Sequence, residues 1–157
     1  MAKISPDLAL NEAEIDALLS AAKHMRIATL GPGAAINLTP MAFGWAHGAI
    51  YTFARGQKVA NLRRDGTATV LVDVGDAWRE LKGIMLQGHA RVLEDVDAEL
   101  TDAGLAAAQM NLGVKHGLTR DGRAVPYAPT ATGNSRRWIV FRPQRIVSWD
   151  NAKLPGA

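Results

Sequence analysis

The residues best suited to chemistry in this sequence lie between Ile50 and Asp73, where three side chains could hold a phosphate. Lys58 and Asn61 are three positions apart in a helix expected over residues 57–64, so they share a face. Thr52, in the strand expected before this helix, adds a hydroxyl. The helix follows a glycine turn, so its first backbone N–H groups point outward at the positive end of its dipole. The pattern suits an anion, and a basic, solvated surface helix between two strands is the alternative interpretation.

Other common catalytic patterns are missing from the sequence. It has no cysteine, which excludes disulfides, thiol nucleophiles and thiolate metal sites. Its four histidines lack metal-ligand spacing such as H-x-x-x-H, so we expect no metal site. None of the motifs G-x-G-x-x-G, G-x-x-x-x-G-K-[ST], G-x-S-x-G or H-E-x-x-H occurs. An enzyme with this make-up would have to take its reactivity from a cofactor.

Length, composition and charge are those of an ordinary globular domain. Of 157 residues, 48% are hydrophobic and 21% charged, which is enough for one domain with a sizeable core. The formal net charge is only +3 and no basic run is interleaved with aromatic residues, which argues against nucleic-acid binding. No apolar run approaches the ~20 residues of a membrane span, and no signal-peptide core opens the chain. We therefore expect a single cytoplasmic domain over residues 1–157, with neither nucleic acid nor membrane as a partner.

The first half of the chain alternates strand-like runs with turns after an N-terminal helix. The helix is expected over residues 12–23, because Asn11 and Glu14 resemble a capping box before an apolar stripe. The strand-like runs cover residues 26–30, 35–45, 50–53 and 67–73. Pro40 is expected to interrupt the second run, at an edge, a bulge or a bend, because proline cannot donate to a strand ladder. Backbone that is not committed to the sheet there could bind a ligand.

The second half predicts a long bent strand, an insertion and two more strands. Residues 81–94 alternate in polarity with Gly88 at the middle, which indicates a strongly bent barrel strand. An insertion over residues 95–135 is expected to be one or two helices, ended by Gly113, and then a basic loop. The runs 137–142 and 145–150 flank an expected turn or bulge at Pro143-Gln144. These elements favour a mainly β fold of six or seven antiparallel strands with flanking helices, in a small barrel whose closure removes its edges.

Several of these segments together resemble the FMN-binding split-barrel superfamily, which includes pyridoxamine 5'-phosphate oxidase and the deazaflavin-dependent reductases. The matching segments are RIATL, LTPMAFGW, YTFARGQKVANLRRD leading to ATVLVD, GHARV and RWIVFRPQRIVSWDNAKL, within residues 22–93 and 137–154. The resemblance implies an antiparallel split β-barrel that forms a homodimer, with the cofactor at the subunit interface. Many members have a serine and an arginine where this chain has Gly56 and Gln57, and a proline where it has Gly66. The signature at the end of true pyridoxamine phosphate oxidases is missing, so that reaction is not assigned.

Carried over to this sequence, the resemblance implies a cofactor site with a phosphate end and a ring end. Lys58 would hold the phosphate and Arg55 would add charge, while backbone around residues 37–41 would meet the edge of the isoalloxazine. Trp149 either packs inside the protein or covers the flavin. The candidate cofactor-binding residues are Thr52, Arg55, Gln57, Lys58, Asn61, Asn37, Thr39, Pro40, Met41 and Trp149.

The resulting hypothesis is a flavin-dependent oxidoreductase that acts on an unidentified small molecule, with FMN or the deazaflavin coenzyme F-420 as hydride carrier. No catalytic acid or base is assigned, because the resemblance implies that the protein positions flavin N5 and excludes water. The basic loop from Val114 and the side chain of Arg79 could select an acidic or phosphorylated substrate. The alternatives are a non-catalytic protein that sequesters flavin or haem, and an empty barrel that acts as an interaction module.

Overall fold

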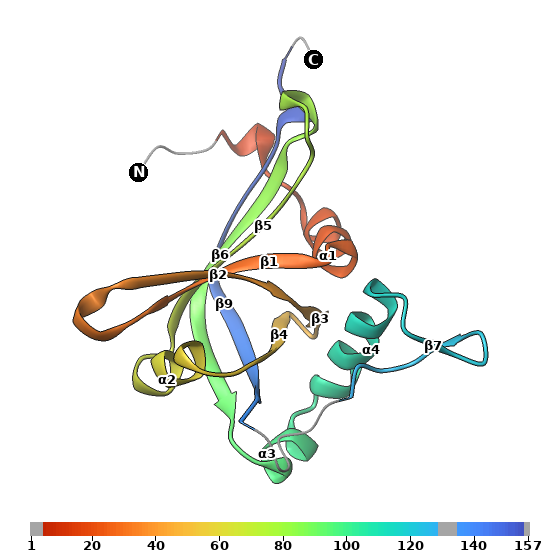
Figure 1. Cartoon of the computed structure of the whole chain (residues 1–157). Coiled ribbons are helices and arrows are strands. Elements are labelled where there is room, and N and C mark those ends of the chain that lie inside the picture. The colour runs from red at the N-terminus through yellow and green to blue at the C-terminus, as the bar shows by residue number, and fades with distance from the viewer. Residues whose placement is uncertain (1–4, 129–134, 156–157) are drawn as a thin grey trace.

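Residues 5–128 and 135–155 are described by a computed structural model in which one curled antiparallel sheet forms a half-barrel (Figure 1). The seven strands follow the order β2-β1-β5-β6-β9-β4-β3. They are β1 (His24–Leu30), β2 (Ile36–Ala42), β3 (Gly44–Ala46), β4 (Ala49–Ala54), β5 (Thr67–Val74), β6 (Lys82–Leu93) and β9 (Arg137–Asp150). The expected mainly β, antiparallel split barrel is confirmed.

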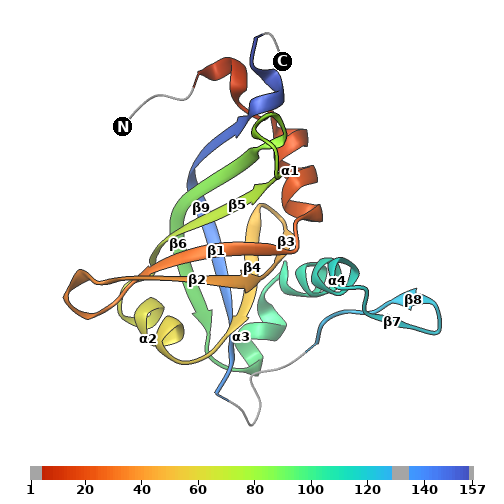
Figure 2. The same ribbon diagram turned by 45° about the horizontal axis from the view of Figure 1, so that its top comes forward.

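Four α-helices and a small hairpin flank this sheet (Figure 2). The helices are α1 (Glu12–Ala21), α2 (Gln57–Arg64), α3 (Val96–Thr101) and α4 (Leu105–Lys115). Short 3-10 turns are η1 (Pro6–Leu8), η2 (Pro32–Ala34), η3 (Trp78–Glu80) and η4 (Asn151–Lys153). The hairpin pairs β7 (Thr119–Arg120) with β8 (Arg123–Ala124) and projects away from the sheet in both views. No helix in the described part of the chain is long and apolar enough to cross a membrane.

Two apolar clusters lie on the sheet and place the helices. The larger one fills the inside of the curled sheet and includes one face of β6, where Ile84 and Leu86 are fully buried. Leu19 of α1 and Val59 of α2 belong to this cluster. The second cluster joins Trp138 and its strand neighbours to the buried side of α4. Both α2 and α4 are therefore fixed to the sheet by buried apolar surface.

The bend of the long strands comes from a single β-bulge. The β6–β9 register pairs Gln87 with Arg145 but Gly88 with Pro143, so Gln144 is the extra residue. A Cβ on Gly88 would lie 2.2 Å from the carbonyl oxygen of Arg142, so only glycine fits there. The bend expected at Gly88 and the bulge expected at Pro143-Gln144 are therefore the same feature. The sequence suggested two strands on either side of this bulge, but β9 is one continuous strand.

The sheet does not close in the way that the sequence analysis expected. Its strand order begins at β2 and ends at β3, and in the described residues β2 pairs with β1 alone. Pro40 lies within β2 without interrupting it, because an edge strand tolerates a missing donor, and the break comes at Phe43 instead. The Thr52 hydroxyl donates to the Ala42 carbonyl at 2.8 Å and fastens the end of β2 to β4. One backbone edge of β2 is thus left outside the sheet.

The insertion also differs from its expected form. It contains two helices, α3 and α4, which agrees with the expectation of one or two helices. However, α4 does not end at Gly113 but continues to Lys115. The segment expected as a basic loop then forms the β7–β8 hairpin. Residues 129–134 of that segment lie outside the described residues.

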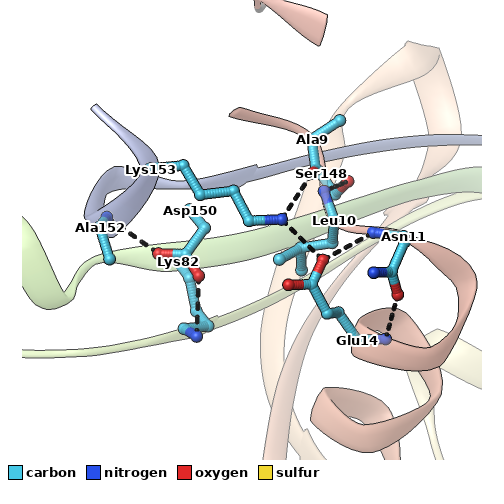
Figure 3. A network of polar contacts seen from close by, with 9 residues as sticks. All are labelled: Ala9, Leu10, Asn11, Glu14, Lys82, Ser148, Asp150, Ala152 and Lys153. Carbon is cyan, nitrogen blue, oxygen red and sulfur yellow. Dashed lines mark hydrogen bonds and ion pairs between the residues drawn. The ribbon is translucent and has the colours of Figure 1, made fainter. Parts of the chain in front are cut away.

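Polar contacts tie the start of the chain to the end of β9 (Figure 3). The expected capping box is present, with Asn11 and Glu14 each accepting from the other's backbone N–H. Lys153 Nζ donates to the Glu14 carboxylate at 2.7 Å, and Asp150 pairs with Lys82 at 2.9 Å. The buried Leu10 N–H donates to Ser148 Oγ at 3.0 Å.

Replacing Ser148 by alanine should lower the free energy of unfolding by about 1–3 kcal/mol, because the buried Leu10 N–H would lose its acceptor. Urea unfolding followed by circular dichroism measures the change. Ser5→Ala is the control, since its hydroxyl bonds Asp7 on the exposed surface and should contribute little. Equal effects of the two substitutions would contradict a structural role for the Leu10–Ser148 bond.

Candidate functional site

The first turn of α2 is presented by a glycine turn at the end of β4. Gly56 has φ 70° and ψ −140°, a left-handed region that favours glycine, and α2 begins at the next residue. No side chain in the described part of the chain caps the start of this helix. Buried Val59 and Leu62 hold α2 on the sheet beside β1 and β6. The N–H groups of the first turn are therefore available at the positive end of a helix whose position is fixed.

The cations at the two ends of α2 are in different situations. At the C-terminal end, Arg63 pairs with Glu94 and Arg64 donates to the Leu30 carbonyl. At the N-terminal end, no hydrogen bond or ion pair joins the half-buried Lys58 or the exposed Arg55 to another part of the described chain. The two positive charges next to the open helix N-terminus thus have no counter-charge among those residues.

Asn61 and Gln57 belong to an internal hydrogen-bond chain. Asn61 is fully buried, its Oδ1 accepts from Gln57 Nε2 at 2.7 Å, and its Nδ2 donates to Thr29 Oγ1 at 3.1 Å. This chain links the first turn of α2 to β1. The structure therefore places both amides beside Lys58 but uses them to position the helix. Thr29, which sequence reasoning missed, could have been found as a polar residue on the same strand face as the apolar Ile27.

The predicted ring-end residues line edge strand β2. Asn37 lies opposite Thr29 and Thr39 lies opposite Ile27, so both face the side of the sheet on which Asn61 bonds Thr29. The Thr39 hydroxyl is buried and has no hydrogen-bond partner among the described residues. We call the combination of Arg55, Lys58, Asn61, the first turn of α2 and residues 37–41 of β2 the α2–β2 site.

Two candidate residues lie outside the α2–β2 site. Thr52 is 2% exposed and donates to the Ala42 carbonyl, so its hydroxyl fastens β2 to β4. Trp149 lies near the far end of β9, opposite Gly83, where its ring occupies the space that a Cβ on Gly83 would need. The α2 end of β9 is marked by the pairing of Trp138 with Phe53. Within one subunit, Trp149 therefore does not join Lys58.

Lys115 is a buried structural residue, although the sequence placed it in a basic, substrate-selecting loop. It is 7% exposed, and its Nζ donates to the carbonyls of Leu19 and Phe43 at 2.7 and 3.1 Å. The same nitrogen lies 3.6 Å from the centre of the Phe43 ring. Burial lowers the pKa of Lys115 from 10.5 to about 7. Lys115 thus connects α4 to α1 and to the junction of β2 with β3.

A second polar cluster that the sequence did not reveal fixes the corner between α3 and α4. The Asp102 side chain is 3% exposed and accepts from the Tyr51 hydroxyl at 2.8 Å. It also pairs with Arg91 at 3.1 Å and accepts from the Gly104 N–H at 3.1 Å. Burial and the Asp102 carboxylate raise the pKa of Tyr51 to about 12. Tyr51 thus stays protonated and acts as a donor that holds the insertion on β4.

Comparison with known proteins agrees with this arrangement. The curled sheet, the helix after β4 and the open edge strand define an FMN-binding split barrel. A family model described as pyridoxamine 5'-phosphate oxidase matches residues 12–150. The chain therefore belongs to the pyridoxamine 5'-phosphate oxidase family. No curated protein matches the sequence.

Solved structures of the same fold carry several different descriptions. A conserved hypothetical protein, Rv2991 from Mycobacterium tuberculosis, is 26% identical with a TM-score of 0.78, over 99% of this chain and 96% of that one. An F420 reductase is 18% identical with a TM-score of 0.59, over 84% and 94%. HutZ, the heme storage protein from Vibrio cholerae, is 14% identical with a TM-score of 0.62, over 88% and 94%. The last two similarities show the fold alone.

Replacing Lys115 by methionine should change how stability depends on pH. Between pH ~7 and ~10.5 the unfolded chain binds a proton at Lys115 that the folded chain does not. The contribution of Lys115 to the free energy of unfolding therefore increases as pH rises. The difference in unfolding free energy between wild type and Lys115→Met should therefore rise by up to about 1.4 kcal/mol per pH unit above pH ~7. Below pH ~6 Lys115 is protonated in both states, and the difference should be flat. Urea unfolding from pH ~5.5 to ~9 measures it, and parallel curves would contradict the lowered pKa of Lys115.

Proposed function

We propose that this protein is a flavin-dependent oxidoreductase, with FMN or the deazaflavin coenzyme F-420 as hydride carrier and a small molecule as substrate. The observation that carries the proposal is the pair of uncompensated cations, Lys58 and Arg55, at the uncapped start of α2 in a chain of this family. A phosphate at that place would meet both a positive charge and free N–H donors.

The residues of the α2–β2 site fit such a cofactor at both ends. Lys58 and the amides of the first turn of α2 would hold the phosphate, and Arg55 would add charge. The free edge of β2, from Asn37 to Met41, offers backbone donors and acceptors for the edge of the ring. The partnerless Thr39 hydroxyl could also bond a ligand there.

The chain's own residues would position the cofactor rather than react with it. A bound flavin supplies hydride transfer at its N5, so no acid or base from the protein is required for that step. In this proposal Gln57, Asn61 and Thr29 keep the first turn of α2 in place, and Thr52 keeps β2 in place. Their effect on cofactor affinity would thus be indirect.

We further propose that two chains form a homodimer through the outer face of the sheet, with the cofactor at the interface. Leu71, Met85 and Val147 are opposite one another on adjacent strands and form an apolar row on that face. On β2, the side chains of Ile36 and Leu38 are 74% and 61% exposed. Exposed apolar area of this kind is typical of a surface that binds another protein. Trp149 lies on the same face and could then cover the cofactor of the partner.

A second candidate function is a non-catalytic protein that sequesters haem or flavin. The fold similarity to the heme storage protein favours keeping it. An absorption spectrum separates the candidates, because bound haem produces a Soret band and oxidised flavin produces its own visible bands. If the purified chain has neither, titration with FMN, F-420 and haem would identify the ligand by the rise in thermal midpoint that a ligand of the folded state must cause.

Lys58→Ala should weaken FMN binding by about 1.5–3 kcal/mol, the range for a charge-assisted hydrogen bond, as measured by quenching of flavin fluorescence. Arg64→Ala is the matched control, because it removes the same charge from the other end of α2, where the side chain bonds the Leu30 carbonyl. Its effect on FMN affinity should stay within about 0.5 kcal/mol. Unchanged binding by Lys58→Ala would remove this residue from the site.

The wild-type chain should be a dimer in size-exclusion chromatography with light scattering, and Leu71→Arg should make it monomeric. Leu71 lies at the centre of the proposed interface, where a buried, unpaired arginine would be costly. Leu100→Arg is the control, since Leu100 is 79% exposed on α3, outside that face. A monomeric wild type that binds its cofactor tightly would contradict the interface model.

A further inference from the structure

A pocket of about 290 Å³ lies between the end of β2 and the helical insertion. Met41 and Ala42 form one wall of this pocket, Phe53 of β4 forms another, and Leu112 of α4 faces them. Its volume is close to the lower end of the range for small-molecule sites, about 300–1,000 Å³. Met41 also belongs to the stretch of β2 that we assign to the flavin ring, so the pocket adjoins the proposed cofactor site.

A buried tryptophan packs against the aromatic wall of the pocket. Phe53 and Tyr127 have ring centres 6.5 Å apart at an angle of 73°. Trp138 is fully buried and contacts both, with ring centres 5.1 Å from Phe53 and 6.3 Å from Tyr127. A wall that is already packed in this way offers flat apolar surface without a large cost of ordering side chains.

No lysine, arginine or carboxylate lines this pocket among the described residues. The Lys115 amine, one residue from the lining His116, is committed to the Leu19 and Phe43 carbonyls. Arg120 and Arg123 are exposed on the β7–β8 hairpin, which projects away from the sheet (Figure 2). The guanidinium carbon of Arg136 lies 5.9 Å from the centre of the Phe53 ring, but Arg136 does not line the pocket. A carboxylate or phosphate inside the pocket would thus lose water without meeting a cation among the lining residues.

His116 is the titratable group of the lining beside Tyr127. Its ring meets that of His24 edge to face with centres 5.8 Å apart. Burial lowers the pKa of His116, and the nearby charges of His24, Lys23 and Lys115 lower it further, against a hydrogen bond to the Lys23 backbone. At neutral pH this imidazole is therefore a neutral hydrogen-bonding group.

We infer that this pocket binds the substrate, and that the substrate is a small, uncharged, planar aromatic molecule. That the bound molecule is a substrate rests on the proposed oxidoreductase function, whereas the binding itself does not. The inference replaces the acidic or phosphorylated substrate that the basic segment of the sequence suggested. Charge on that segment is either buried, as at Lys115, or displayed on the hairpin.

Two probes with the same ring system test the chemical class by isothermal titration calorimetry. 2-Naphthol is uncharged at neutral pH, and 2-naphthoate carries a carboxylate. We expect 2-naphthol to bind the full chain at least about tenfold more tightly than 2-naphthoate, because the carboxylate would be desolvated without a partner. Equal or tighter binding of 2-naphthoate would overturn the assignment of an uncharged ligand.

Paired substitutions test the location. Leu118 lines the pocket and is 37% exposed, so Leu118→Trp should fill the pocket and weaken 2-naphthol binding by about tenfold or more. Val114 is 57% exposed and does not line the pocket, so Val114→Trp adds the same ring outside it and should leave affinity within about twofold. Equal affinities of the two variants would overturn the location.

A measurement on the wild-type chain keeps the test independent of how the variants fold. In a methyl NMR spectrum of chain labelled at methionine, 2-naphthol should shift the Met41 signal and leave Met110, on the exposed side of α4, unmoved. An unmoved Met41 signal would overturn the inference. Repeating both titrations with Lys58→Ala separates the two proposals: weakened FMN binding with intact 2-naphthol binding supports both, and intact binding of both ligands overturns the cofactor site alone. A wild-type chain that binds FMN but not 2-naphthol overturns the pocket alone.

Discussion

The unpaired edge of β2 is the constraint on which the rest of this structure depends. An edge strand exposes a row of backbone donors and acceptors that a protein must cover, distort or use. Here β2 pairs with β1 along its length, and among the described residues the bond from the Thr52 hydroxyl to the Ala42 carbonyl joins one end of β2 to β4. Pro40 removes one backbone donor from the middle of the strand. The exposed Ile36 and Leu38 side chains lie on the same strand. This edge is therefore where we propose that the cofactor and a second subunit bind.

Most buried polar side chains around that edge are engaged in fixing the elements beside it. Asn61 and Thr29 join α2 to β1, and Lys115 joins α4 to the β2–β3 junction through the Phe43 carbonyl. A buried polar group is stable only when it is bonded in this way. Lys58 and Arg55 form no such bonds with the described residues, and that contrast distinguishes groups that hold the fold from groups that could bind a ligand. The family supports a flavin-type cofactor, and in the proposed function these two charges would hold its phosphate.

Local sequence patterns predicted much of the fold, because a few neighbouring residues are enough to indicate most helices and strands. The box at Asn11 and Glu14 marked α1, and alternation with a central Gly88 marked the bent β6 strand. The helix over residues 57–64 was predicted with its correct ends, since a glycine turn precedes it. The places where prediction failed depend on partners distant in sequence. Pro40 is tolerated because β2 is an edge, and α4 passes Gly113 because the chain near Val125 packs closely against it.

The candidate site was predictable in composition but not in the role of each residue. Sequence spacing placed Lys58 beside Asn61, and the structure agrees, yet spacing could not reveal that Thr29 takes up the Asn61 amide from 32 positions away. Nor could it show that Lys115 is buried, because its acceptors, the Leu19 and Phe43 carbonyls, lie 96 and 72 positions earlier in the chain. Side chains that are polar and close in sequence are thus candidates only, and the long-range bonds decide which of them remain available.

The central claim is that the start of α2 holds a flavin phosphate beside the edge of β2. A crystal structure of the full chain grown with FMN tests it most directly. The account predicts density for the phosphate within hydrogen-bond distance of Lys58 Nζ and the first amides of α2, with the ring along β2. FMN bound elsewhere, or a phosphate that contacts neither Lys58 nor those amides, would contradict it.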